Sequence, residues 1–171
     1  MYGADAVIPV TRTPLGNICT GAMQREPELF RAMAIKGGEL FLRTATGSFV
    51  PADMQMNSVY HRVYTAVCNN AVSPGNQFFE EPGGAGGSAI YDPNGTAIAM
   101  ARNEFEQLVA ANIPIKSFRA GHKLPDFAWD LYAPVYSQYV RKYPSNKFAN
   151  KLPADLREAG EWLNDPKNVN W

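Results

Sequence analysis

One stretch of the chain combines a candidate nucleophile with the start of a helix. The segment LGNICTGAMQREPELFRAMAIKGGELFL, residues 15–42, carries Cys19, one of two cysteines among 171 residues. A cysteine attacks a carbonyl carbon as the thiolate, so it needs a base or positive charge nearby, and Arg25 and Glu26 are the candidates in the following loop. The backbone N–H of Thr20 would then help to bind the oxyanion. The alternative is a small hydrophobic residue buried in a strand, and both interpretations stay open.

The other reactive side chains form no motif. Cys68 lies in an apolar run and is predicted to be a buried structural thiol. His61 is expected to cap the carbonyls of a helix end, and His122 is expected to be solvated in a basic loop. Two Cys and two His without paired spacing argue against a zinc site, and no nucleophile elbow supports a Ser-His-Asp triad. Arg43 follows a strand and has two interpretations, a ligand pocket and a surface ion pair.

Two further segments each have a structural and a functional interpretation. The glycine-rich PGGAGG at 82–87 is predicted to be a flexible lead into a hairpin, because no Gly-Lys-Ser/Thr follows as in a phosphate-binding loop. The C-terminal aromatic residues are predicted to pack or to form a dimer contact, because no basic excess favours base stacking. These residues are Phe127, Trp129, Tyr132, Tyr136 and Tyr139.

Strands and helices alternate around the candidate nucleophile. Residues 5–23 are predicted to form a hairpin about the turn at 13–16. A helix is expected to begin at Pro27 and to end at Gly37-Gly38, followed at once by a strand at 40–42. The short connections favour a βαβ unit with parallel strands.

The pattern then continues to the C-terminus. We expect a helix at 51–62, a buried strand at 63–71, a hairpin of strands 88–91 and 96–100, a strand at 106–113 and a short helix at 153–163. The chain is predicted to be one domain, 1–171, in which residues 121–171 form a helical and aromatic arm. This arm is expected to lie across the domain or on a partner subunit.

Composition excludes several classes of protein. Apolar residues make up 46% and charged residues 19%, and the formal net charge is zero. A globular domain is therefore expected, with neither nucleic acid nor membrane as partner. The absence of a signal-peptide pattern and of a disulfide framework favours a cytoplasmic protein with reduced thiols.

Four pieces, in their order, resemble the C-terminal half of the nitrilase, or carbon–nitrogen hydrolase, superfamily. GNIC followed by EPELFRAMAIKGGELFLR is similar to the family's nucleophile strand and the Pro-Glu helix after it. SVYHRVYTAVCNNA (58–71) resembles the next helix and strand. GGSAIYDPNG (86–95) resembles the family's Gly-x-Ser-x-Ile-x-Asp-x-x-Gly hairpin, and LVAANIPI its last core strand. The resemblance covers roughly residues 5–120, and FLRTATG (41–47) is most similar to aliphatic amidase and formamidase relatives.

Two departures concern the family's triad of Glu, Lys and Cys. The family's Glu and Lys lie upstream of the matched region, so the chain is expected to lack the N-terminal half that holds them. Cys19 stands eight residues before Pro27 and three after Gly16, where the family has six and about seven. Counting from the proline places Gly21 at the nucleophile position, and counting from the glycine places Met23 there. Either the loop is remodelled and Cys19 enters the site, or the nucleophile is absent.

The resemblance implies an α/β fold that is part of an α-β-β-α sandwich with a C-terminal helical and aromatic arm. It implies hydrolysis of a small amide or nitrile through a Cys adduct in the complete enzyme, without metal or organic cofactor. By resemblance Cys19 is the candidate catalytic residue, while Thr20, Arg43 and Thr44 line the substrate pocket. Family members assemble as homo-oligomers, so the same is expected here. The alternative is a catalytically degenerate module with a structural or oligomerisation role.

Overall fold

The computed structural model describes residues 6, 8–22, 24–47, 50–71, 86–124, 126–139 and 153–165. The chain divides into two compact units, Met1–Pro125 and Asp126–Trp171. The division falls close to the predicted start of the C-terminal arm, whereas the place of this arm against the rest of the chain stays a prediction. No helix in the described part of the chain is both long and apolar enough to cross a membrane.

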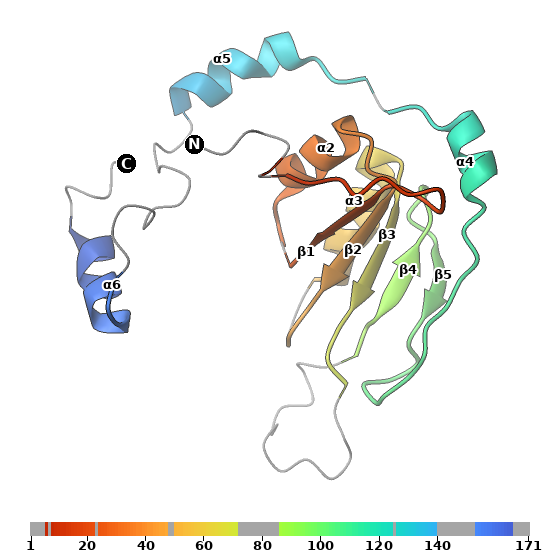
Figure 1. Cartoon of the computed structure of the whole chain (residues 1–171), viewed down its shortest axis with the longest axis horizontal. Coiled ribbons are helices and arrows are strands. Elements are labelled where there is room, and N and C mark those ends of the chain that lie inside the picture. The colour runs from red at the N-terminus through yellow and green to blue at the C-terminus, as the bar shows by residue number, and fades with distance from the viewer. Residues whose placement is uncertain are drawn as a thin grey trace. The chain divides into compact units, whose positions relative to one another are not determined.

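The first unit is built on a five-stranded sheet of order β1-β2-β3-β4-β5 (Figure 1). β1 (Ile18–Gly21), β2 (Leu40–Thr44) and β3 (Tyr64–Cys68) are parallel neighbours. β4 (Ala89–Tyr91) and β5 (Ala97–Met100) add an antiparallel hairpin to β3. The predicted βαβ unit and the hairpin about residues 92–95 are therefore confirmed.

Helix α2 (Pro27–Ile35) connects β1 to β2 and has clear start and stop signals. Pro27 occupies the first helical position, where its missing N–H costs nothing, and Glu28 lies at the positive end of the helix dipole. At the other end Gly37 adopts a φ of +89°, which permits the N–H of Gly38 to reach the carbonyl of Met33 at 2.9 Å. The sequence predicted both ends.

Helix α3 (Pro51–His61) connects β2 to β3, and with α2 it covers one face of the sheet (Figure 1). The buried core on this face joins α2 to the strands, with Phe30 and Phe41 ring centroids 5.4 Å apart. The Thr65 hydroxyl of β3 lies 2.7 Å from the Ser58 hydroxyl of α3. Because side chains alternate along a strand, every second residue points to the opposite face. There Thr20, Leu42 and Thr44 are exposed.

Two strand predictions are wrong. Within the described residues the hairpin at 5–23 is reduced to one antiparallel bridge between Thr11 and Ile18. The next hydrogen-bonded pair on this edge would need a backbone N–H from Pro9, which has none. Residues 106–113 form no strand. At the start of this range the Gln107 side chain bonds the nearby backbone instead: its Oε1 accepts the N–H of Arg102 at 2.9 Å. Such local bonds compete with sheet pairing.

Three helices follow the sheet in the described part of the chain. α4 (Ile115–Gly121) and α5 (Trp129–Tyr139) were not predicted, and the internal Pro134 of α5 argued against a helix there. The predicted terminal helix is confirmed as α6 (Leu156–Asn164), where the Asp155 side chain accepts the N–H of Glu158 at 2.8 Å. PGGAGG lies largely outside the described residues.

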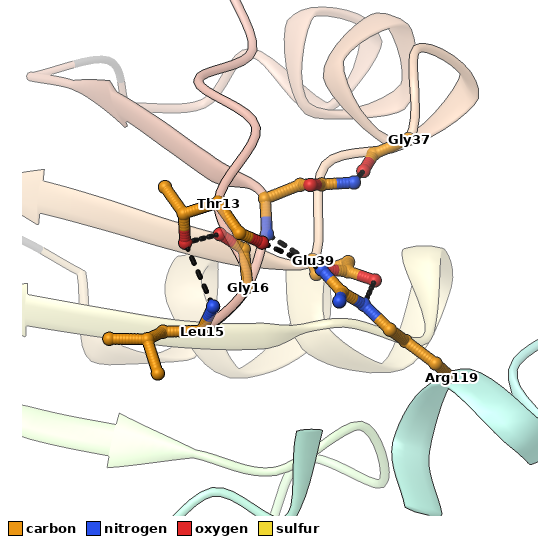
Figure 2. A network of polar contacts seen from close by, with 7 residues as sticks. Thr13, Leu15, Gly16, Gly37, Glu39 and Arg119 are labelled. Atoms are coloured by element: carbon orange, nitrogen blue, oxygen red, sulfur yellow. Dashed lines mark hydrogen bonds and ion pairs between the residues drawn. The ribbon is translucent and has the colours of Figure 1, made fainter. Parts of the chain in front are cut away.

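A half-buried ion pair fastens α4 to the start of β2 (Figure 2). Arg119 Nε and Nη2 donate to the two oxygens of Glu39 at 2.7 and 2.8 Å. The same carboxylate accepts the backbone N–H of Asn17 at 2.6 Å, and Arg119 also donates to the Thr13 carbonyl at 3.1 Å. The hydrogen bond from Arg119 is the main reason that the pKa of Glu39 lies below its usual value. A helix 80 residues away in sequence is thereby held at the amino end of the sheet.

His61 is a core residue, not the helix cap that we expected. Its ring is 1% exposed, stacks 6.4 Å from Phe30 with an interplanar angle of 4°, and lies with Nε2 3.1 Å from Asn57 Oδ1. Burial lowers its pKa to about 4, and the positive charge of Arg31 adds to this effect.

We expect the buried His61 to make the fold sensitive to mild acid. Between pH 6.5 and 4 the unfolded chain binds a proton at His61 that the folded chain does not, so stability rises with pH in this window. The free energy of unfolding should fall by about 2 kcal/mol from pH 7 to pH 5. Urea unfolding at the two pH values measures this. His61→Phe should shrink the difference by more than half, and an unchanged difference would assign it to other groups.

Candidate active site

A cavity of about 900 Å³ lies where the three parallel strands end. Its floor includes side chains of the exposed sheet face, among them Leu42, Ala66 and Ile90, and residues 105–109 form part of its wall. The carboxyl ends of parallel strands are where α/β folds bind ligands. This cavity is therefore the candidate active site.

The three predicted pocket residues lie together on this cavity. Thr20 in β1 and Thr44 in β2 are both exposed, so their hydroxyls are open to a ligand. Arg43 is only 5% exposed, so its ion pair with Asp53 is a buried pair and not the surface pair of the alternative interpretation. Its Nη2 donates to Gln24 Oε1 at 2.6 Å and its Nη1 lies 3.8 Å from Asp53 Oδ2. Arg43 thus ties the loop after β1 to α3 while it lines the cavity.

Cys19 lies in the core and not on this cavity. In the parallel ladder it pairs with Phe41, whose side chain is also buried against the helices. Its side chain is 2% exposed, and its sulfur is so close to Gly38 that a Cβ atom there would lie 2.6 Å from Sγ. Burial raises the pKa of the Cys19 thiol to about 11, although the positive charge of Lys36 lowers it in part. At neutral pH the thiol is protonated and shielded.

The loop residues considered as partners for Cys19 do not activate it in this geometry. Arg25 and Glu26 are exposed, and the Arg25 backbone N–H donates to Asp53 Oδ1 at 3.3 Å. Lys36, whose charge lowers the pKa of the thiol, donates a hydrogen bond from its ammonium group to the Ile8 carbonyl. Gly21, at the nucleophile position counted from Pro27, lines the cavity but has no side chain to react. Met23, at the other position, lies outside the described residues.

Cys68 was predicted to be buried and is exposed. It is the last residue of β3 and pairs with Thr44, so its side chain falls on the open face and lines the cavity. The apolar run that contains Cys68 does not indicate on which face of the sheet its side chain lies. Period-two counting from the buried Thr65 and Val67 would have placed Cys68 correctly.

His122 is half-buried, not solvated as predicted. Its ring centroid lies 4.5 Å from that of Phe118, and burial lowers its pKa below the usual value. No three residues of the types His, Cys, Asp and Glu gather as metal ligands in the described part of the chain.

Comparison with known proteins places the chain in a family. The carbon–nitrogen hydrolase family model matches residues 2–123, so the chain belongs to this family. An amidase from Nesterenkonia sp. superposes with a TM-score of 0.55 and 19% identity, over 75% of this chain and 47% of that chain. Saccharomyces cerevisiae Nit3, of the nitrilase superfamily, superposes with a TM-score of 0.53 and 26% identity, over 67% and 44%.

These comparisons confirm the predicted fold class, an α/β nitrilase fold of which this chain supplies part. The chain spans about half the length of the solved relatives that it matches. No curated protein matches it. The Nesterenkonia amidase has been solved with acrylamide and with the acetamide part of fluoroacetamide, each joined to its active-site cysteine. In the present chain Cys19 is buried in the core and does not line the cavity.

Proposed function

We propose that the cavity at the ends of β1, β2 and β3 binds a small amide or nitrile. Membership of the carbon–nitrogen hydrolase family supports this, as does the place of the cavity at the carboxyl ends of the parallel strands. The hydroxyls of Thr20 and Thr44 offer a donor and an acceptor to an amide, beside the apolar Leu42 and Ala66. No metal or organic cofactor is required.

We further propose that this chain binds the amide without forming a covalent adduct at Cys19. The observation that carries this is the buried Cys19 thiol, with its pKa of about 11, outside the cavity. Hydrolysis in a complete family member would need a thiolate, a Glu and a Lys on the cavity side of the sheet. The chain is thus proposed to act as a binding module of an amide-hydrolysing protein, or as a catalytically degenerate relative.

Butyramide, which has been solved bound to the Nesterenkonia amidase, is a suitable probe. We expect saturable binding to the chain in a calorimetric titration, with no release of ammonia. Thr44→Val should weaken binding about fivefold, because one hydrogen bond to the ligand is lost. Thr46→Val is the matched control: Thr46 is exposed two residues further along and does not line the cavity. Equal binding by both variants, or none by the wild type, would refute the proposed site.

We also infer that copies of this chain associate. Apolar side chains on α5 are exposed, among them Trp129, Leu131 and Val135. Such side chains commonly mark contacts with another molecule. Size-exclusion chromatography with light scattering should give a mass above that of one chain, lowered by the double substitution Trp129→Ser and Leu131→Ser. A monomer at every concentration would contradict the inference.

We propose a cytoplasmic location for the protein. Cys19 and Cys68 are both free thiols, which suits a reducing compartment. Cell fractionation tests this, and recovery from an oxidising compartment would contradict it.

A further inference from the structure

We propose that a second cleft, between the end of α3, the β4–β5 turn and α4, binds an oxyanion: the phosphate or carboxylate group of a small organic molecule. The cleft has a volume of about 630 Å³. It lies beside the start of β3, whereas the candidate active site lies beside its end. It is therefore a separate site, and the proposed amide binding does not depend on it.

The polar groups of the cleft are suited to an anion. Arg62, His122 and Lys123 line it together with the hydroxyl of Ser117 and the amide of Asn94, and none of the lining residues is Asp or Glu. Within the described part of the chain no carboxylate pairs with Arg62 or Lys123. Arginine and lysine without a carboxylate partner are the side chains with which proteins bind phosphate and carboxylate groups.

The neighbouring carboxylates are already engaged. Glu39 accepts two hydrogen bonds from Arg119 and one from the backbone of Asn17. Asp92, in the β4–β5 turn, uses Oδ1 to accept the backbone N–H groups of Asn94 and Thr96, each at 2.9 Å. In the described part of the chain neither carboxylate forms an ion pair with Arg62 or Lys123, so these two cations are left for an external anion.

The backbone of Arg62 supports a role for its side chain. Arg62 ends α3 with φ 52° and ψ 48°, in the left-handed region. Helix ends of this kind usually carry Gly or Asn, because other L side chains rarely adopt that conformation. A guanidinium there also interacts favourably with the carboxyl end of the helix dipole, which is the purely structural explanation. The two explanations differ in whether the charge is needed for binding an anion.

The walls of the cleft are fixed on the core. The Glu39–Arg119 pair in Figure 2 holds α4, which supplies Ser117 and Phe118. Phe118 packs edge-on against Tyr64 of β3, with ring centroids 5.3 Å apart, and its ring also contacts that of His122. A preformed wall lowers the cost of ordering the site when a ligand binds.

His122 offers a spectroscopic reporter of the cleft. Its pKa is lowered by burial and by the charge of Arg62, while Glu39 raises it in part. An anion bound beside the ring would favour the protonated imidazole and raise the pKa. The chain has only one other histidine, the buried His61, so the two proton resonances are readily distinguished.

The experiment titrates the 171-residue chain with sulfate at constant ionic strength, by calorimetry and by the histidine proton resonances. We expect saturable binding and an upward shift of the His122 pKa. Arg62→Asn, which suits the left-handed backbone, and Lys123→Gln should each weaken binding about tenfold without lowering the melting temperature. Lys116→Gln is the matched control, since Lys116 is an exposed cation of α4 outside the cleft. Glycerol phosphate and succinate, titrated in parallel, distinguish a phosphate from a carboxylate source.

Two results would overturn the proposal. One is the absence of saturable binding for sulfate, glycerol phosphate and succinate alike. The other is binding that Arg62→Asn, Lys123→Gln and Lys116→Gln weaken to the same extent, which would mean unspecific attraction to positive charge. Normal binding by a folded Arg62→Asn variant would leave Arg62 with its structural role alone.

Discussion

Iodoacetamide is expected to label Cys68 and to leave Cys19 unlabelled in the folded chain. Cys68 is exposed at the end of β3, on the cavity, whereas Cys19 is 2% exposed in the core. The attacking species is the thiolate, so reactivity depends on the pKa of each thiol as well as on access. Tryptic mass spectrometry after timed labelling at pH 7.5 gives the two rates separately.

The expected difference in rate is large. Burial raises the pKa of Cys19 from 9.0 to about 11, which alone lowers its thiolate fraction about a hundredfold. Shielding by Phe30, Met33 and Phe41 adds to this protection. Cys19 should become labelled in urea at the rate of an ordinary thiol. Rapid labelling of Cys19 well below pH 8 in the folded chain would instead show an activated thiolate in a remodelled loop.

Gly38→Ala is expected to destabilise the fold by about 3 kcal/mol, because it inserts a methyl group where Cys19 packs. The new Cβ would lie 2.6 Å from Cys19 Sγ, 2.7 Å from Phe41 Cε1 and 2.9 Å from the Met33 carbonyl oxygen. The carbonyl belongs to the helix end and cannot move away cheaply. Urea unfolding of the variant measures the effect.

A double-mutant cycle separates the contribution of the sulfur. In a Cys19→Ala background, which has no Sγ, Gly38→Ala should cost about 1 kcal/mol less than in the wild type. Gly121→Ala is the matched control: nothing lies within 4 Å of its Cβ position, so its stability should change by less than about 0.5 kcal/mol. Additive effects of Cys19→Ala and Gly38→Ala would mean that the thiol does not pack on Gly38.

The sequence was sufficient for the elements that are fixed by local chemistry. Pro27 and Pro51 begin α2 and α3, and Gly37 ends α2, because proline and a left-handed glycine act within a few residues of themselves. The β4–β5 hairpin follows in the same way from its turn, where Gly95 adopts a φ of +79°.

The sequence was insufficient where the outcome depends on distant partners. Leu-Val-Ala-Ala at 108–111 has the composition of a strand, yet it pairs with no strand in the described part of the chain. Helix α4 depends on a contact between Arg119 and Glu39, which no local pattern indicates.

The candidate site was predicted only in part, because the positions of its cysteines depend on how the strands pair. Arg43 was placed by the rule that strand ends face ligands, and Thr20 and Thr44 were placed by the family resemblance. All three line the cavity. The side of the sheet on which a cysteine lies depends on the register of the strand, and this register differs for Cys19 and Cys68. Cys19 shares the face of the buried Phe41, whereas Cys68 shares the face of the exposed Thr44. A shift of one residue would exchange these environments.

The central claim is that the cavity binds an amide without Cys19, and a crystal structure of the chain with butyramide tests it most directly. We predict the amide in the cavity, within hydrogen-bonding distance of the hydroxyl of Thr20 or Thr44. Cys19 Sγ should remain on the helix side of the sheet, beside Gly38 and Phe41. An amide in contact with Cys19 Sγ, or a Cys19 side chain that faces the cavity, would contradict the claim.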